Sequence, residues 1–93
     1  RYVIERDIPE IGSAERDALR EASQQSNGVL AEMKAENKSI QWEHSYVAGD
    51  KTFCIYIADE ETLIHEHAER SGFPATKVTV VKGMIDPVTA EAS

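Results

Sequence analysis

Two runs of aromatic and β-branched residues, 40–47 and 51–57, stand in the middle of the chain on either side of a Gly49-Asp50 turn. Two such runs around a short glycine-containing turn predict a β-hairpin. The predicted hairpin also carries most of the side chains that could bind a ligand or take part in chemistry. These are Trp42, His44, Tyr46, Cys54 and Tyr56.

A helical pattern precedes the hairpin. Apolar and small residues recur at three- and four-residue steps and predict a helix over 13–35, with Ser13 as its N-cap and one buried stripe. Gly28 lies inside this stripe, where glycine is unfavourable, so we expect a bend or a close packing contact there. The predicted stripe consists of Ala18, Leu19, Ala22, Ser26, Val29, Leu30 and Met33.

A second helix is expected after the hairpin, with Asp59 as its N-cap and Ser71-Gly72 as its stop. Its buried face should consist of Leu63, Ile64, His67 and Ala68. Apolar runs at 2–4 and 77–85 predict the first and last strands.

The resulting order of elements, β-α-β-β-α-β, predicts an α+β fold of the ferredoxin-like split βαβ type. In that fold two helices cover one face of a single antiparallel sheet. We expect one domain over 1–87 and a loose C-terminal tail over 88–93. The other face of the sheet then needs a partner, a ligand or polar residues.

The hairpin turn decides which face of the sheet carries the aromatic residues. We expect the helix-facing residues of the second run to be Phe53, Ile55 and Ile57. A two-residue loop pairs Tyr46 with Phe53 and places the three candidate residues of the first run, 40–47, on the helix side. A three-residue loop or one bulge moves them to the open face, beside Cys54 and Tyr56. The three candidates are Trp42, His44 and Tyr46.

Length and charge restrict the possible partners. A chain of 93 residues supports one domain with a modest core, and a homodimer would cover more of its apolar surface. The net charge of −7 and the scattered basic residues argue against nucleic-acid binding. No apolar run approaches the roughly 20 residues that span a membrane. The single Cys54 and the charged, signal-free segment 1–7 predict a cytoplasmic protein.

The hairpin motifs W-x-H-S-Y-V at 42–47 and D-K-T-F-C-I-Y at 50–56 resemble a family of small bacterial proteins once catalogued only as a domain of unknown function. The likeness continues through 3–7, 23–27, 67–68 and 72–74. This resemblance implies a dimeric ferredoxin-like fold and, for part of the family, nickel binding. It implies no particular reaction.

The three histidines, His44, His65 and His67, are the candidate metal ligands, because imidazole suits nickel, copper and zinc. His65 and His67 lie two positions apart on a predicted helix, so they point to opposite sides and belong to separate sites. His65 shares a helix face with Glu61 and Glu69. A structural role, with a half-buried or solvated imidazole, is the competing interpretation for each histidine.

A small-molecule site is the alternative to a metal site. Its candidate pocket, on the open face of the sheet, consists of Trp42, Tyr46, Cys54 and Tyr56. In an enzyme of the dimeric ferredoxin-like barrel type, His44 would be the acid or base. A lone Cys in a strand is more typical of a small buried hydrophobe, and no nucleophile motif accompanies it. The sequence therefore favours binding of nickel or another borderline divalent ion by a homodimer over catalysis.

Overall fold

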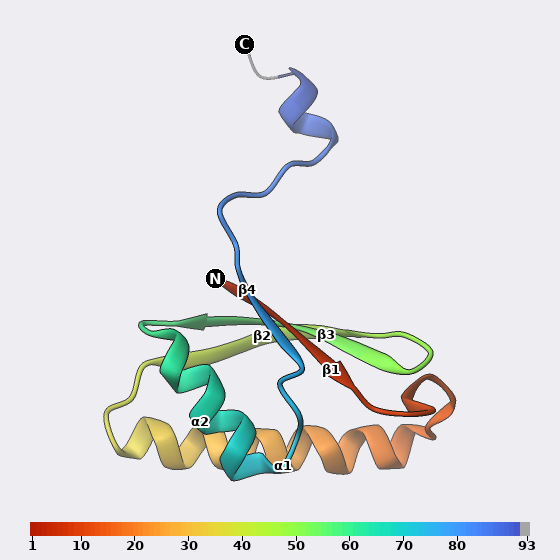
Figure 1. Cartoon of the computed structure of the whole chain (residues 1–93), viewed down its shortest axis with the longest axis vertical. Coiled ribbons are helices and arrows are strands. Elements are labelled where there is room, and N and C mark those ends of the chain that lie inside the picture. Colours follow the sequence, from red (N-terminus) through yellow and green to blue (C-terminus); the bar gives the residue numbers. More distant parts are fainter. Residues whose placement is uncertain (92–93) are drawn as a thin grey trace.

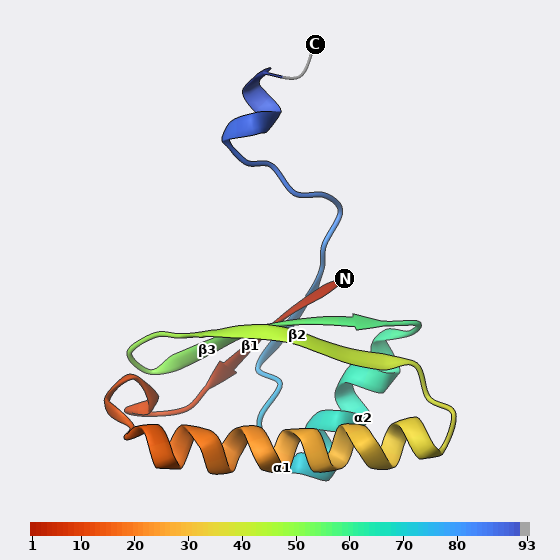
Figure 2. The same ribbon diagram turned by 180° about the vertical axis from the view of Figure 1, so that it is seen from behind.

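The structure, a computed structural model, describes residues 1–91. One four-stranded antiparallel sheet has the order β2-β3-β1-β4, and both helices lie on the same face of it (Figures 1 and 2). The predicted β-α-β-β-α-β order and ferredoxin-like fold class are confirmed. The elements are β1 (Tyr2–Asp7), η1 (Ile11–Ser13), α1 (Arg16–Ala35), β2 (Ile40–Val47), β3 (Lys51–Ala58), α2 (Glu61–Ser71), β4 (Lys77–Val80) and η2 (Pro87–Glu91).

The core lies between the two central strands and the helices. Ile4 on β1 and Cys54 and Tyr56 on β3 pack with Ile64 of α2, and all four side chains are buried. Helix α1 adds Val29 and Met33 to the buried apolar set. Full burial of a side chain of this size stabilises a fold by roughly 1.5–3 kcal/mol. No helix within residues 1–91 is long and apolar enough to span a bilayer.

Helix α1 begins two residues later than the sequence suggests, with Glu15 rather than Ser13 as its N-cap, because η1 precedes it. Ser13 belongs to this 3₁₀ turn, where its hydroxyl donates to the Glu10 carbonyl, so it is not the N-cap. The turn packs directly on the hairpin loop, and the Gly12 N–H donates to the Gly49 carbonyl at 2.8 Å. A Cβ on Gly12 would lie only 2.5 Å from the Ala48 carbonyl oxygen, so the contact requires glycine.

The predicted stripe of α1 is confirmed at its centre, where Ser26, Val29 and Met33 are buried. Ala18 is exposed, whereas the remaining stripe residues are half-buried. Gly28 is also exposed, and no atom lies within 4 Å of the position that its Cβ would occupy. The expected packing contact at Gly28 is therefore wrong, and α1 runs through it without interruption.

The hairpin combines both of the features that the sequence left as alternatives. Its loop has two residues, the Ala48 N–H donates to the Lys51 carbonyl, and Tyr46 lies opposite Phe53. A bulge between Trp42 and His44 then reverses the alternation along β2. Trp42 consequently lies opposite Tyr56 on the helix face, whereas His44 and Tyr46 are on the open face.

The expected helix-facing set of β3, Phe53, Ile55 and Ile57, was wrong. The buried residues are the alternate ones, Thr52, Cys54 and Tyr56. Both sets are largely apolar or aromatic, so their hydrophobicity does not distinguish the two faces of the strand.

Helix α2 has Glu60 rather than Asp59 as its N-cap and ends at Ser71. Its C-cap is Gly72, whose φ of 79° is the left-handed conformation that glycine favours. Its buried residues are Ile64, His67, Ala68 and Ser71, and Leu63 is half-buried.

Strand β4 is shorter than the predicted 77–85. The Val81 N–H donates to the carbonyl of Arg1, which precedes β1, and within the described segment 82–91 no residue pairs with a strand. Residues 81–91 leave the sheet on the side opposite the helices (Figures 1 and 2). Of the predicted tail, residues 92 and 93 lie outside the described residues.

Candidate functional site

The candidate residues occupy three separate parts of the molecule. His44 and Tyr46 are on the open face of the sheet, and His65 is on the solvent-exposed side of α2. The remaining candidates lie between the sheet and the helices. These are Trp42, Cys54, Tyr56 and His67.

His67 is fully buried in the core. Its ring is tilted against that of Tyr56, with 5.4 Å between centroids. The Nε2 atom lies 3.1 Å from Ser26 Oγ and 3.4 Å from the Ser26 carbonyl oxygen, which can only accept. Burial, aided by the positive charge of Arg6, lowers the pKa of His67 to about 4. A neutral, buried imidazole with this hydrogen bond is a structural group rather than a ligand presented to a metal ion in solvent.

His65 is exposed and has a carboxylate beside it. Its Nε2 atom lies 3.1 Å from Oε2 of Glu61, one helical turn earlier on α2. Two ligands at adjacent positions of a metal ion, each about 2.1 Å from it, lie about 3 Å apart. The spacing between the His65 nitrogen and the Glu61 oxygen therefore fits two adjacent coordination positions of a borderline divalent ion.

His44 is exposed on the open face, where its ring makes an edge-to-face contact with Tyr46 at 5.1 Å. Both line a shallow depression of about 600 Å³ that also contains Ile55 and Met84. The neighbouring Glu43 carboxylate is bound by Arg1, with Nε 2.6 Å from Oε1, and this contact lowers the pKa of Glu43. His44 therefore has an aromatic neighbour rather than a free carboxylate.

Within residues 1–91, no three His, Cys, Asp or Glu side chains converge where a metal ion could be held. The histidines are therefore not parts of one site within this chain. Among the described residues, the histidine with a carboxylate in contact is His65, beside Glu61, and further ligands to an ion there would be water or groups from another molecule.

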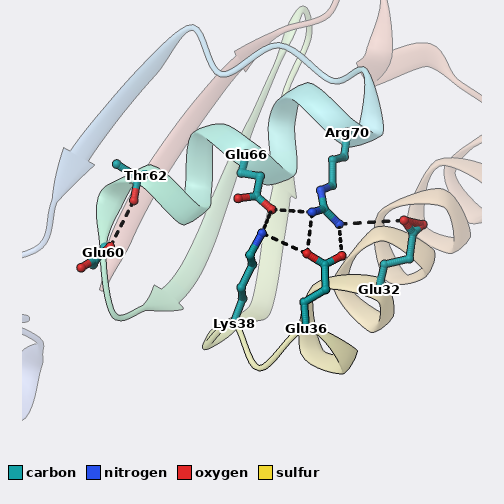
Figure 3. Close-up of polar contacts among 7 residues, drawn as sticks. All are labelled: Glu32, Glu36, Lys38, Glu60, Thr62, Glu66 and Arg70. Carbon is teal, nitrogen blue, oxygen red and sulfur yellow. Dashed lines mark hydrogen bonds and ion pairs between the residues drawn. The ribbon is translucent and has the colours of Figure 1, made fainter.

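The most extensive group of charged contacts joins the helices rather than forming a metal centre (Figure 3). Arg70 of α2 donates to both carboxylate oxygens of Glu36 at 2.7 Å and lies 2.8 Å from Glu66. Lys38 contacts the same two carboxylates, at 3.0 and 2.6 Å. Arg70 and then Lys38 lower the pKa of Glu36 to about 2. These carboxylates are already neutralised by basic residues, so we assign them a role in joining α1 to α2.

A pocket of about 190 Å³ lies on the helix face of the sheet. It is lined by three of the four residues expected in a ligand pocket, Trp42, Cys54 and Tyr56, but not by Tyr46. Cys54 and Tyr56 are on the buried, helix-facing side of β3. The bulge in β2 places Trp42 on the same face and leaves Tyr46 on the open face.

Arg6 is the pocket residue that the sequence interpretation missed. It is only 3% exposed, and its Nη1 donates to the carbonyls of Phe73 and Pro74 at 3.3 and 3.0 Å. The sequence did contain a signal that Arg6 faces the core. Arg6 is two positions after Ile4 on β1, and alternate residues of a strand share one face.

A family model described as "Nickel responsive protein SCO4226-like" matches residues 2–81 of this chain. The chain belongs to this family. A crystal structure of SCO4226 from Streptomyces coelicolor A3(2) is similar, with a TM-score of 0.72 and 15% sequence identity over 90% of this chain and 98% of that one. At this identity the likeness shows the fold alone. No curated protein matches the chain.

Membership of the SCO4226-like family confirms the resemblance inferred from the hairpin motifs. It also supports a metal-related role at a coarse level, because the family is described by its response to nickel.

Proposed function

We propose that the protein binds Ni²⁺ and that Glu61 and His65 supply two of the ligands. The observation that carries the proposal is the 3.1 Å separation between Nε2 of His65 and Oε2 of Glu61, on the exposed face of α2. An imidazole and a carboxylate at this spacing suit a borderline ion better than Mg²⁺ or Ca²⁺, which favour oxygen ligands. Membership of a nickel-responsive family favours nickel among these ions.

The competing histidines support the proposal less well. His67 is buried and bonded to Ser26, so a metal ion could reach it only after local unfolding. His44 is accessible but has Tyr46 rather than a carboxylate beside its ring. We therefore assign His44 to a separate position on the open face, where a second copy of the chain could supply further ligands.

The test is calorimetric titration of untagged protein with Ni²⁺ at pH 7.5 and 5.5. His65→Ala and Glu61→Gln should each weaken binding by roughly tenfold or more, since each removes one of two protein ligands. Glu21→Gln is the matched control, because it makes the same charge change at an exposed position on α1. Binding should be weaker at pH 5.5, because imidazole must be unprotonated to coordinate. Affinity for copper should exceed that for nickel, and both should exceed that for manganese.

If His65→Ala and Glu61→Gln bind like the wild type while His44→Ala does not, the nickel site is on the open face instead. If His44→Ala, His65→Ala and His67→Ala all bind like the wild type, coordination by histidine is wrong. Attraction to the acidic surface alone would persist at pH 5.5 and be screened by salt.

A further inference from the structure

The pocket on the helix face contains a buried positive charge without a counter-ion. Arg6 lines the pocket, and within residues 1–91 no carboxylate lies within 4.0 Å of its guanidinium nitrogens. Its Nη1 is satisfied by two backbone carbonyls, but its buried Nη2 has no hydrogen-bond partner in the described chain. Burying an ionised group without a charged partner is costly, so a negative charge at this point would be strongly favoured.

Three hydroxyl-bearing side chains, Ser26, Thr52 and Tyr56, line the same pocket as the guanidinium. Thr52 lies directly opposite Arg6 across the β1–β3 pair. The Tyr56 ring centroid is 6.0 Å from the Arg6 guanidinium carbon, and the Tyr56 hydroxyl is 3.5 Å from Ser26 Oγ. All four side chains line the same pocket. A carboxylate could therefore accept from the planar guanidinium and from a neighbouring hydroxyl group.

The rest of the pocket is mostly apolar and no Asp, Glu, Lys or His is among its described lining residues, so its one charged group is Arg6. One cation matches one negative charge, and the apolar walls favour an organic body over a fully hydrated inorganic ion. An apolar cavity of about 150 Å³ is large enough for benzene. A volume of about 190 Å³ thus suits a ring or short chain with one carboxylate. The apolar walls are Ile8, Ile11, Leu19, Trp42, Val47 and Phe73.

We propose that this pocket binds a small organic monocarboxylate, with its carboxylate on Arg6 and its apolar body against Leu19 and Trp42. The pocket shares no residue with the Glu61–His65 pair, so this site is independent of the proposed nickel site.

The experiment measures binding of benzoate, cyclohexanecarboxylate and hexanoate by calorimetry, with benzamide and sulfate as comparison ligands. Benzamide keeps the ring but has no charge, and sulfate keeps the charge but has no apolar body. We expect saturable binding of at least one of the three acids and none of benzamide or sulfate. Equal binding of benzoate and benzamide, or no binding of any acid up to about 10 mM, would overturn the proposal.

Two variants test the two halves of the pocket. Arg6→Met removes the charge and should abolish binding of the acid, whereas Arg20→Met makes the same change at an exposed position of α1 and should not. Ala22→Leu should block the pocket without altering Arg6 and weaken binding by at least about tenfold.

The thermal midpoint without ligand separates a binding role from a structural one. Burying a charge without a counter-ion costs more than the hydrogen bonds from Arg6 to the Phe73 and Pro74 carbonyls contribute, and Arg6→Met removes both. We therefore expect the ligand-free midpoint of Arg6→Met to equal or exceed that of the wild type. If Arg6→Met does not fold, the binding measurement on Ala22→Leu tests the proposal instead. Acid binding by Ala22→Leu equal to that of the wild type would overturn the proposal.

Discussion

At the scale of single residues, burial separates the roles of the two histidines on α2. His65 is exposed beside Glu61, whereas His67, two positions later, has its ring in the core against Tyr56. A helix turns by about 200° over two residues, which is why neighbours at this spacing meet such different surroundings. The same imidazole group is therefore available to a metal ion at one position and structural at the other.

The buried histidine should make the protein sensitive to mild acid. Because the pKa of His67 is lowered from 6.5 to about 4, the unfolded chain binds a proton at a higher pH than the folded chain does. Stability should therefore fall as the pH decreases from 6.5 toward 4, by about 2 kcal/mol at pH 5. Urea unfolding at pH 7.5 and 5 measures this loss in the wild type, in His67→Gln and, as a control, in His65→Gln.

His67→Gln should lose less stability between the two pH values than the wild type does, although its stability at pH 7.5 will be lower. His65→Gln should follow the wild type. Parallel profiles for His67→Gln and the wild type would show that another group is responsible for the acid sensitivity.

At the scale of secondary-structure elements, Gly12 in η1 and Gly28 inside α1 have opposite structural roles. Gly12 lies against the backbone of the hairpin loop, whereas Gly28 is surrounded by open space on the exposed side of α1. A glycine in a helix interior costs roughly 0.5–1 kcal/mol relative to alanine, so Gly28→Ala should stabilise the protein by about that amount.

Gly12→Ala should have the opposite effect. Its Cβ would lie 2.5 Å from the Ala48 carbonyl oxygen and 2.9 Å from the Gly49 Cα, so η1 and the hairpin loop would have to separate. Forced overpacking of this kind costs roughly 1–3 kcal/mol. Chemical unfolding of both variants measures the two effects, and a loss of stability in Gly28→Ala would show that the helix surface there is not free.

The contacts between the helices should also depend on pH. The pKa of Glu36 is lowered from 4.5 to about 2, first by Arg70 and then by Lys38, so its contribution to stability is complete above about pH 4.5 and is lost as the pH falls toward 2. Glu36→Gln should therefore destabilise the protein at pH 7 and have little effect at pH 2. Salt should reduce the difference, since these groups are solvent-exposed.

Glu32→Gln is the control for that comparison, because the Glu32 carboxylate lies 4.0 Å from Arg70 and makes the weaker contact. An equal effect of the two substitutions at pH 7 would contradict the assignment of the close pairing to Glu36.

Helical periodicity was sufficient to predict both helices, because a buried stripe such as Ser26, Val29 and Met33 repeats with the period of the helix. The runs of aromatic, β-branched and apolar residues then predicted the strands and so the order of elements. The two-residue alternation of a strand was ambiguous for β3, because the residues on both of its faces are largely apolar. The bulge after Trp42 has no marker in the sequence, yet it divides the predicted pocket between two faces. Arg6 was overlooked because charged residues are usually exposed.

At the scale of the whole molecule, the open face of the sheet has an apolar centre. Val3, Phe53 and Ile55 point to that side with Tyr46, which is 62% exposed. The segment after β4 leaves the sheet on the same side (Figure 1). Its Met84 and Ile85 side chains are 82% and 84% exposed. Exposed apolar side chains on both the sheet and this segment are typical of a surface that another molecule covers.

We propose that a second copy of the chain covers this surface and that the segment 81–91 of each copy contacts the open face of the other. Light scattering at micromolar concentration should then give twice the chain mass for the wild type. Tyr46→Glu and Met84→Glu should each shift the equilibrium toward the monomer, because they place a charge in an apolar contact without altering the core. Gln24→Glu adds the same charge at an exposed position on α1 and should leave the dimer intact. A wild type that is monomeric under these conditions would exclude the proposed dimer, and a dimer unaffected by Tyr46→Glu and Met84→Glu would place the interface on another surface.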